Sequence, residues 1–210
     1  GVTVSTKGKE FNTYNAYPGN YWQTSSNHIS AICEDKNGNL WLGSPYNGID
    51  VLYWYQDTVK NYSFEEDNPY SLGKGSIFDI YRDKDSIMWI GTHMGGLQYY
   101  QPDKNRFITY NHDPNDSQTI ADNDVRAITE DNRGNLWLTV HGKGVDRFDK
   151  EKEIFYHLNE KQNGLTSNWT FDILHSSRGN LWVATSWGLN MLPKGDSIFN
   201  NYINNESDSN

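Results

Sequence analysis

The chain has 210 residues, of which 27 are acidic and 18 basic, so its net charge is −9. This charge argues against nucleic acid and against an anionic membrane surface as partners. There is no run of 18 apolar residues and no signal peptide, so membrane attachment is expected only through segments outside this sequence. The single cysteine, Cys33, excludes an intramolecular disulfide and is expected to be a small buried apolar residue in a strand.

A nine-residue stretch recurs four times along the chain, at Glu34–Leu42, Arg82–Ile90, Glu130–Leu138 and His175–Val183. Each copy carries one tryptophan in its eighth position, and the four are separated by 48, 48 and 45 residues; they are Trp41, Trp89, Trp137 and Trp182. Self-similarity at a period of this size indicates a solenoid, a propeller or an array.

One repeat predicts four short strands. In the third copy, residues 125–130 and 136–140 are apolar and β-branched runs on either side of the turn cluster Asp131–Asn135. Residues 145–148 and 154–157 follow as two further strands, each after a turn. No segment has a helical period over three turns. Four antiparallel strands in 45 to 48 residues are typical of a β-propeller blade, whose inner strands are covered on both faces by the neighbouring blades.

The predicted fold is therefore all-β, with about four and a half propeller blades in a single fragment over residues 1–210. Residues 1–14 match the third and fourth strands of a blade and form the half blade. Full blades are expected at about 27–62, 75–110, 123–157 and 168–202. A partial ring has two uncovered blade ends, so we expect either self-association through them or closure into a tighter, strained ring.

Residues shared by all copies are expected to be structural, and those that differ at matching positions are free to bind a ligand. The four repeat tryptophans are accordingly expected in the core. The off-pattern aromatics lie in loops or near them: Trp187 and Tyr46 in turns between second and third strands, Trp22 in a link between blades, and Trp169 at the start of a first strand. Exposed aromatic faces beside polar groups suit stacking on sugar rings, and the alternative is that these residues only close gaps between blades.

Two histidines, His93 and His141, occupy matching turns of adjacent repeats. A metal pair would need a third ligand, and none has a recognisable spacing. We therefore predict surface residues or hydrogen-bonding contacts to a ligand, with no metal and no cofactor.

The pattern Ile-x-x-Asp-x-x-Gly-Asn-Leu-Trp-Leu resembles the two-component-regulator propeller repeat. It is specific at residues 29–52, 125–148 and 170–192, and it departs in the second copy, where Ser86 and Ile87 replace Gly-Asn. The resemblance implies a ring of usually seven blades in the periplasmic sensor region of a Bacteroidetes hybrid two-component protein. It further implies recognition of an oligosaccharide by a sensor dimer, and control of a histidine kinase attached elsewhere.

Two alternatives stay open at this level. A glycan lyase or hydrolase would need paired carboxylates, or arginine with tyrosine and an acid, and no such set recurs or clusters in the sequence. A propeller that binds another protein is equally compatible with the fold, because a fold alone specifies no activity. We expect a periplasmic ligand-sensing segment with no catalytic residues of its own.

Overall fold

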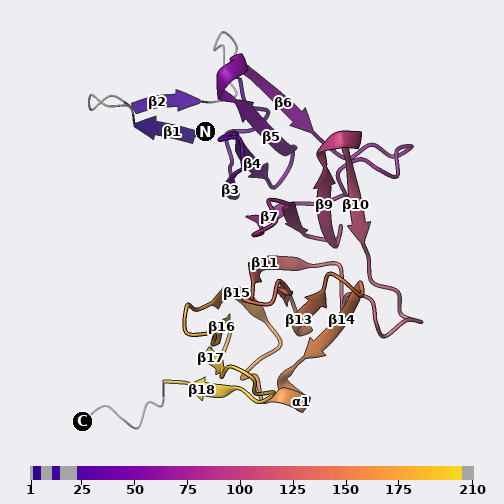
Figure 1. Cartoon of the computed structure of the whole chain (residues 1–210), viewed down its shortest axis with the longest axis vertical. Helices are drawn as coiled ribbons and strands as arrows, with labels where there is room; N and C mark the ends of the chain where they lie inside the picture. Colours follow the sequence, from indigo (N-terminus) through magenta and orange to yellow (C-terminus); the bar gives the residue numbers. More distant parts are fainter. Residues whose placement is uncertain (1, 6–10, 15–22, 205–210) are drawn as a thin grey trace. The chain divides into compact units, whose positions relative to one another are not determined.

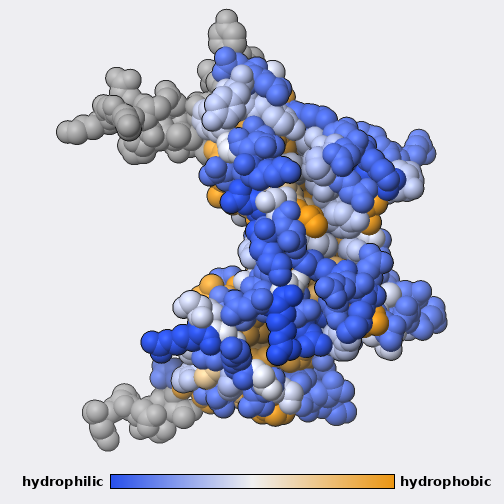
Figure 2. Space-filling model, in the orientation of Figure 1, coloured by the Kyte–Doolittle hydropathy of each residue, from blue (hydrophilic) through white to orange (hydrophobic). Residues whose placement is uncertain are grey.

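The computed structural model describes residues 2–5, 11–14 and 23–204. The described chain consists of one hairpin and four antiparallel sheets of four strands each, with a single α-helix of four residues, which confirms the all-β prediction and the four-stranded blades. It forms two compact units, unit 1 (Gly1–Thr109) and unit 2 (Tyr110–Asn210), whose strands are labelled in Figure 1. Most of the visible surface of each unit is hydrophilic (Figure 2).

Unit 1 contains the hairpin and two blades. The hairpin pairs β1 (Val2–Ser5) with β2 (Phe11–Tyr14), at the two strands expected for the half blade. The first blade comprises β3 (Ala31–Glu34), β4 (Leu40–Ser44), β5 (Gly48–Tyr53) and β6 (Thr58–Tyr62), with the short helix η1 (Trp54–Gln56) before its last strand. The second comprises β7 (Ile77–Arg82), β8 (Met88–Thr92), β9 (Leu97–Gln101) and β10 (Arg106–Tyr110), with η2 (Pro102–Lys104) at the matching place.

Unit 2 contains two further blades. The third is β11 (Val125–Glu130), β12 (Leu136–Val140), β13 (Gly144–Asp149) and β14 (Ile154–Leu158). The fourth is β15 (Thr170–His175), β16 (Leu181–Thr185), β17 (Gly188–Leu192) and β18 (Asn200–Tyr202), and α1 (Glu160–Asn163) lies in the link before it. In all four sheets the strands pair in chain order. No helix among the described residues is long and apolar enough to cross a membrane.

A single aspartate organises the turn between the first and second strands of a blade. In the third blade, Asp131 Oδ1 accepts the backbone N–H of Arg133 at 2.8 Å and of Asn135 at 3.0 Å. Its Oδ2 accepts Asn135 Nδ2 at 2.9 Å and the indole Nε1 of Trp137 at 3.0 Å. The Asp-x-x-x-Asn-x-Trp spacing of the repeat therefore exists because one carboxylate closes the turn and anchors the core tryptophan.

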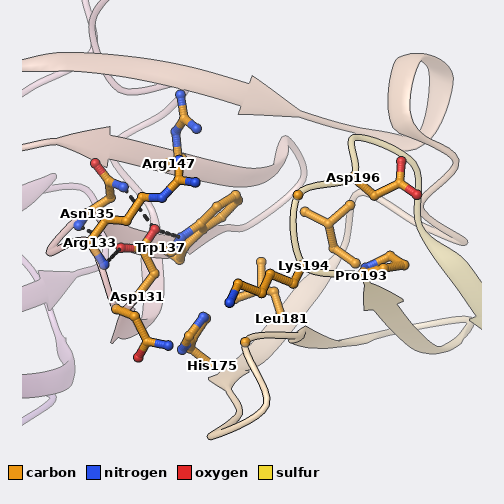
Figure 3. Close-up of a pocket in the computed structure, with 14 residues that line it drawn as sticks. Asp131, Arg133, Asn135, Trp137, Arg147, His175, Leu181, Pro193, Lys194 and Asp196 are labelled. Carbon is orange, nitrogen blue, oxygen red and sulfur yellow. Dashed lines mark hydrogen bonds between the residues drawn. The ribbon is translucent and has the colours of Figure 1, made fainter.

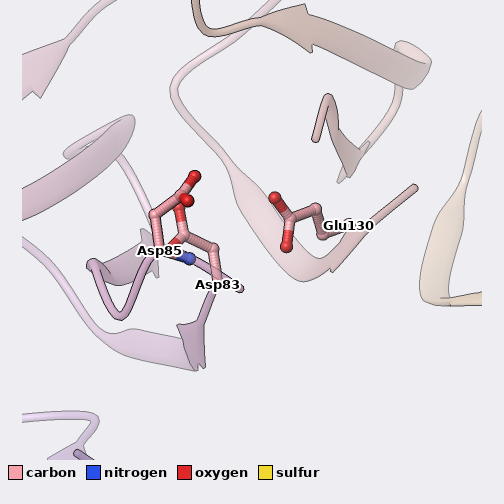
Figure 4. Close-up of side chains that lie close together, drawn as sticks. All are labelled: Asp83, Asp85 and Glu130. Carbon is pink, nitrogen blue, oxygen red and sulfur yellow. The ribbon is translucent and has the colours of Figure 1, made fainter. Parts of the chain in front are cut away.

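The other blades use this turn with informative changes. Asp35 accepts the Trp41 indole at 3.3 Å, and Asp83 accepts the Trp89 indole at 2.9 Å. Figure 4 shows Asp83 and Asp85 on the second of these turns. Ser86 has a φ of 65° where the third blade has Gly134 at 89°, so the departure seen in the sequence keeps the left-handed backbone without a glycine.

Three of the four repeat tryptophans are buried as predicted: Trp41 is 2% exposed, Trp89 3% and Trp137 9%. The prediction was wrong for Trp182, which is only half-buried and lines a shallow apolar depression with Leu174 and Leu189. Ser176 replaces the aspartate in this blade, so no carboxylate is available to hold the indole N–H. The prediction for Cys33 also needs correction: it is half-buried at the edge of the unit 1 core, where burial raises the pKa of its thiol.

A second structural position, which the repeat pattern does not reveal, lies on the third strand of each blade. Its side chains are almost fully buried, and each accepts the backbone N–H of the preceding interblade link. The pairs are Asp50 with Ser25 at 2.7 Å, Gln98 with Gly73 at 2.9 Å, Asp146 with Ala121 at 2.8 Å and Asn190 with Thr166 at 2.9 Å. We call these four residues the link latches. They hold the interblade links in place, since a buried polar group must keep its hydrogen bonds.

In the first and third blades the latch is braced by the residue opposite it on the fourth strand. Asn61 Nδ2 donates to Asp50 at 2.9 Å in the first blade, and the His157 Nδ1 lies 2.7 Å from Asp146 in the third. Burial raises the pKa of the Asp146 carboxyl, and the hydrogen bond to Asp146 raises the pKa of His157 against the opposing effect of burial. His157 Nε2 is directed at the Ser117 carbonyl at 3.0 Å.

Candidate functional site

A β-bulge lies at the start of the first strand in three of the blades. The register shifts between Ile77 and Asp79, between Val125 and Ala127, and between Thr170 and Asp172. The residues in the bulges are Phe78, Arg126 and Phe171. A bulge turns its side chain out of the regular alternation, and bulges are over-represented next to binding and active sites.

In unit 2 the bulge brings exposed rings together. His141, in the turn between β12 and β13, makes an edge contact with Trp169 at a centroid distance of 4.7 Å and lies 5.4 Å from Phe171. Trp169 is 55% exposed and Phe171 49%, and Trp187 in the turn between β16 and β17 is 71% exposed. We call His141, Trp169, Phe171 and Trp187 the aromatic rim.

The backbone beneath the rim is held by a set of short hydrogen bonds. Ser186, next to Trp187, donates its N–H to the Trp169 carbonyl at 2.9 Å and is linked through its hydroxyl to Ser167 at 2.9 Å. The His141 Nδ1 lies 3.1 Å from the Thr170 carbonyl, which only accepts, so Nδ1 carries the proton and Nε2 is left as an acceptor. The rings of the rim are thus exposed on a rigid support.

The charged neighbours of the rim are paired. Arg126, in the bulge of the third blade, donates to both oxygens of Asp124, at 2.7 Å from Nε and 3.0 Å from Nη2. The backbone of His141 donates to the Asp124 carbonyl at 2.9 Å. The rim therefore offers flat apolar faces, one imidazole acceptor and a fixed ion pair. Together these groups can bind a ring-shaped polar ligand by stacking and hydrogen bonding.

The remaining predicted site residues lie in unit 1 or outside the described chain. Tyr46 is 79% exposed and makes an edge contact with His28 at 5.9 Å. His93 is half-buried beside Phe78, with ring centroids 5.8 Å apart. Trp22 falls outside the described residues. Of the six predicted residues, the structure thus brings His141 and Trp169 into contact and places Trp187 on the adjoining turn.

Phe171 belongs to the rim but escaped the sequence analysis. A signal for it existed, because the position it occupies holds Ser30, Phe78 and Arg126 in the other copies. A position that holds serine, phenylalanine or arginine in different copies is not fixed by the blade. It was overlooked because a regular strand would bury alternate side chains, and the bulge that re-aims this one has no signature in the sequence.

Comparison with known proteins identifies the repeat. Residues 24–46, 71–94 and 119–142 match the model of the two component regulator propeller. No curated protein matched the chain.

Solved structures share the fold. The extracellular domain assigned to a hybrid two component system of B. thetaiotaomicron aligns with a TM-score of 0.77 at 24% identity, covering 85% of this chain and 25% of its own. A domain assigned to a one component system of the same organism aligns at 0.73, with the same identity and coverage. Virginiamycin B lyase from Staphylococcus aureus aligns at 0.65 with 14% identity, over 85% of this chain and 56% of its own.

The present chain spans a quarter of the length of the two B. thetaiotaomicron proteins. At these identities the structural alignments establish the fold, whereas the evidence for the family comes from the matched repeat segments. Each of the three matched segments contains the closing aspartate and the core tryptophan, so these segments are two component regulator propeller repeats.

Proposed function

We propose that this chain is the extracytoplasmic ligand-sensing propeller of a hybrid two-component signalling protein, that it binds an oligosaccharide, and that it has no catalytic activity of its own. The observation that carries this proposal is the aromatic rim: three aromatic rings, each about half exposed or more, supported by hydrogen-bonded backbone. Exposure of such rings to water is unfavourable in free energy. Stacking on the apolar faces of sugar rings removes them from water and offsets this free-energy cost.

The signalling part of the proposal rests on the repeat family and on the extracellular domains that share the fold. These also support a periplasmic location. Binding at the rim would then favour one of two arrangements of the sensor, and so bias the attached histidine kinase by the difference in affinity between them.

The test is a thermal-shift and calorimetric screen of the chain against plant and host oligosaccharides. A ligand at about a hundred times its dissociation constant adds about 2.7 kcal/mol of stability. Trp187→Ala should abolish the shift, whereas Tyr55→Ala, which removes a 91% exposed ring elsewhere, should leave it unchanged.

Two outcomes would replace this proposal. Shorter sugar products after prolonged incubation would indicate a glycan-active enzyme, since the fold alone specifies no activity. Indifference to every sugar, together with capture of a protein through the rim, would indicate a protein-binding propeller.

A further inference from the structure

Unit 2 contains a cavity at the end of the blades opposite the aromatic rim. It has a volume of about 310 Å³ and lies among the turns that join β11 to β12, β15 to β16 and β17 to β18. The rim lies at the other end of β12 and β16, so the two sites are separated by the length of a strand. The volume is at the lower end of the range of about 300–1,000 Å³ for small-molecule sites.

The cavity is lined by four basic side chains, and we call it the cationic pocket. They are Arg133 and Arg147 from the third blade and His175 and Lys194 from the fourth. Figure 3 shows Lys194 reaching from its turn toward the side of the pocket that Trp137 and His175 form. Gathering these groups in a chain of net charge −9 runs against its overall electrostatics.

Arg147 is the central group of the pocket. Its guanidinium stacks over Tyr156 at 4.4 Å and lies 6.0 Å from the Trp137 ring. Its Nε is buried, and within the described residues it has no hydrogen-bond partner. A buried donor without an acceptor is destabilising, so the protein itself leaves the hydrogen bonding of Arg147 incomplete.

Blade architecture does not require an arginine here. Arg147 pairs with the repeat tryptophan across the strands, and the same position holds Val51, Tyr99 and Met191 in the other blades. Three unrelated side chains therefore suffice for packing. The charge at this one copy is available for a separate purpose.

The two acids of the pocket are already engaged. Asp131 accepts four hydrogen bonds in its turn; burial opposes its ionisation, but the donors from Asn135, Trp137 and the backbone outweigh burial and lower its pKa. Asp196 accepts the backbone N–H groups of Ser197 and Ile198. Within the described chain, neither Arg133, Arg147 nor Lys194 has an ion pair with either acid.

We propose that the cationic pocket binds an oxyanion group of a small organic ligand, a carboxylate or a sulfate, with Arg147 as its central donor. The guanidinium fork matches the two oxygens of such a group, and Lys194 adds a compact charge. The floor of Trp137, Leu181 and Leu192 would carry the apolar side of the ligand. This site is independent of the sugar-binding role proposed for the rim.

The experiment is calorimetric titration of the whole chain with three probes of similar size: glucuronate, glucose 6-sulfate and glucose. We expect at least one anionic probe to bind, glucose not to bind at this pocket, and affinity to fall as salt is raised. The carboxylate and sulfate arms separate the two sources of the charge. Binding of neither anion, or equal binding of glucose with no dependence on salt, would overturn the proposal.

Matched variants locate the binding. Arg147→Met introduces the residue that the fourth blade carries at this position and should weaken anion binding at least tenfold; Lys194→Met, on an exposed turn, serves the same purpose should Arg147→Met fail to fold. Lys161→Met removes an exposed charge on α1, and Trp187→Ala alters the rim; both should keep affinity within twofold. Unchanged binding in Lys194→Met and folded Arg147→Met, or loss in Trp187→Ala alone, would place the anion elsewhere.

Discussion

In each unit a repeat tryptophan of one blade faces the next blade, but the side chains that meet it differ. In unit 1, Trp41 stacks on Tyr62 with centroids 6.0 Å apart and meets Tyr100 edge-on at 5.1 Å. Phe107 closes the cluster at 5.2 Å from Tyr100 and 5.4 Å from Tyr62. Both tyrosine hydroxyls reach Asn105 Oδ1, at 3.0 and 2.9 Å, so the polar ends are satisfied as well.

Unit 2 has smaller side chains at the corresponding places. Leu158 occupies the position of Tyr62, opposite Val145 as Tyr62 is opposite Ile49. Leu192 occupies that of Tyr100, one residue after the partner of the repeat tryptophan. The two tyrosines of unit 1 thus correspond to leucines in unit 2, and one of these, Leu192, lines the cationic pocket. The repeat specifies the packing of strands, and the residues outside the repeat decide whether a gap between blades is filled or open.

The largest loss of stability is expected at the repeat tryptophans, which both units share. Trp41→Ala and Trp137→Ala should each cost about 3–5 kcal/mol of unfolding free energy, because each removes a buried ring and leaves a cavity. Trp182→Ala should cost clearly less, since Trp182 is half-buried and has no aspartate partner. Urea denaturation followed by circular dichroism measures all three. Equal losses would show that the fourth blade packs as the others do.

The filled gap of unit 1 can be converted to the unit 2 pattern by Tyr62→Leu. The change removes one ring and two hydrogen bonds, and we expect a loss of about 2 kcal/mol. Burial, followed by the hydrogen bond to Tyr100, raises the pKa of the Tyr62 phenol, so the hydroxyl stays protonated and the loss should not vary between pH 6 and 9. A neutral or stabilising effect would mean that the aromatic cluster contributes nothing to blade packing. The reciprocal change, Leu158→Tyr, is the control for crowding in unit 2.

The link latches of the two units should respond differently to pH. The folded-state pKa of His157 is raised above its unfolded value of about 6.5, so its contribution is fully present below that pH. It is lost as pH rises through the higher folded pKa. His157→Asn copies the Asp50–Asn61 pair of unit 1 and should flatten this part of the stability curve. Denaturation midpoints between pH 5 and 9 compare the two proteins. An unchanged slope of stability against pH would show that protonation of His157 does not contribute to stability.

The smallest effect on stability is expected at the aromatic rim. Trp187→Ala should change the unfolding free energy by no more than about 0.5 kcal/mol, because the side chain is 71% exposed. The same variant should lose oligosaccharide binding. A loss of stability as large as that of Trp137→Ala would remove the distinction between structural and ligand-binding tryptophans.

Much of this molecule was determined by the sequence alone. The recurring Asp, Asn and Trp predict the turn, the strand and the core position together, since one carboxylate must serve all three. The variation among copies singled out Trp169 and Trp187, and the matching turns of adjacent repeats singled out His141 together with His93. Both inferences are local: they depend on residues within one repeat, whose geometry the spacing dictates.

Other features were decided only by tertiary structure, because they depend on residues that approach from different blades. The bulge that turns Phe171 toward His141, and the link latches such as Asp146 with Ala121, join residues 25 to 30 positions apart. The half-buried state of Trp182 follows from its neighbours on the sheet face. The cationic pocket exists because Arg133 and Arg147 of the third blade line the same gap as His175 and Lys194 of the fourth. Packing between blades sets the size of such a gap, and no single repeat contains that information.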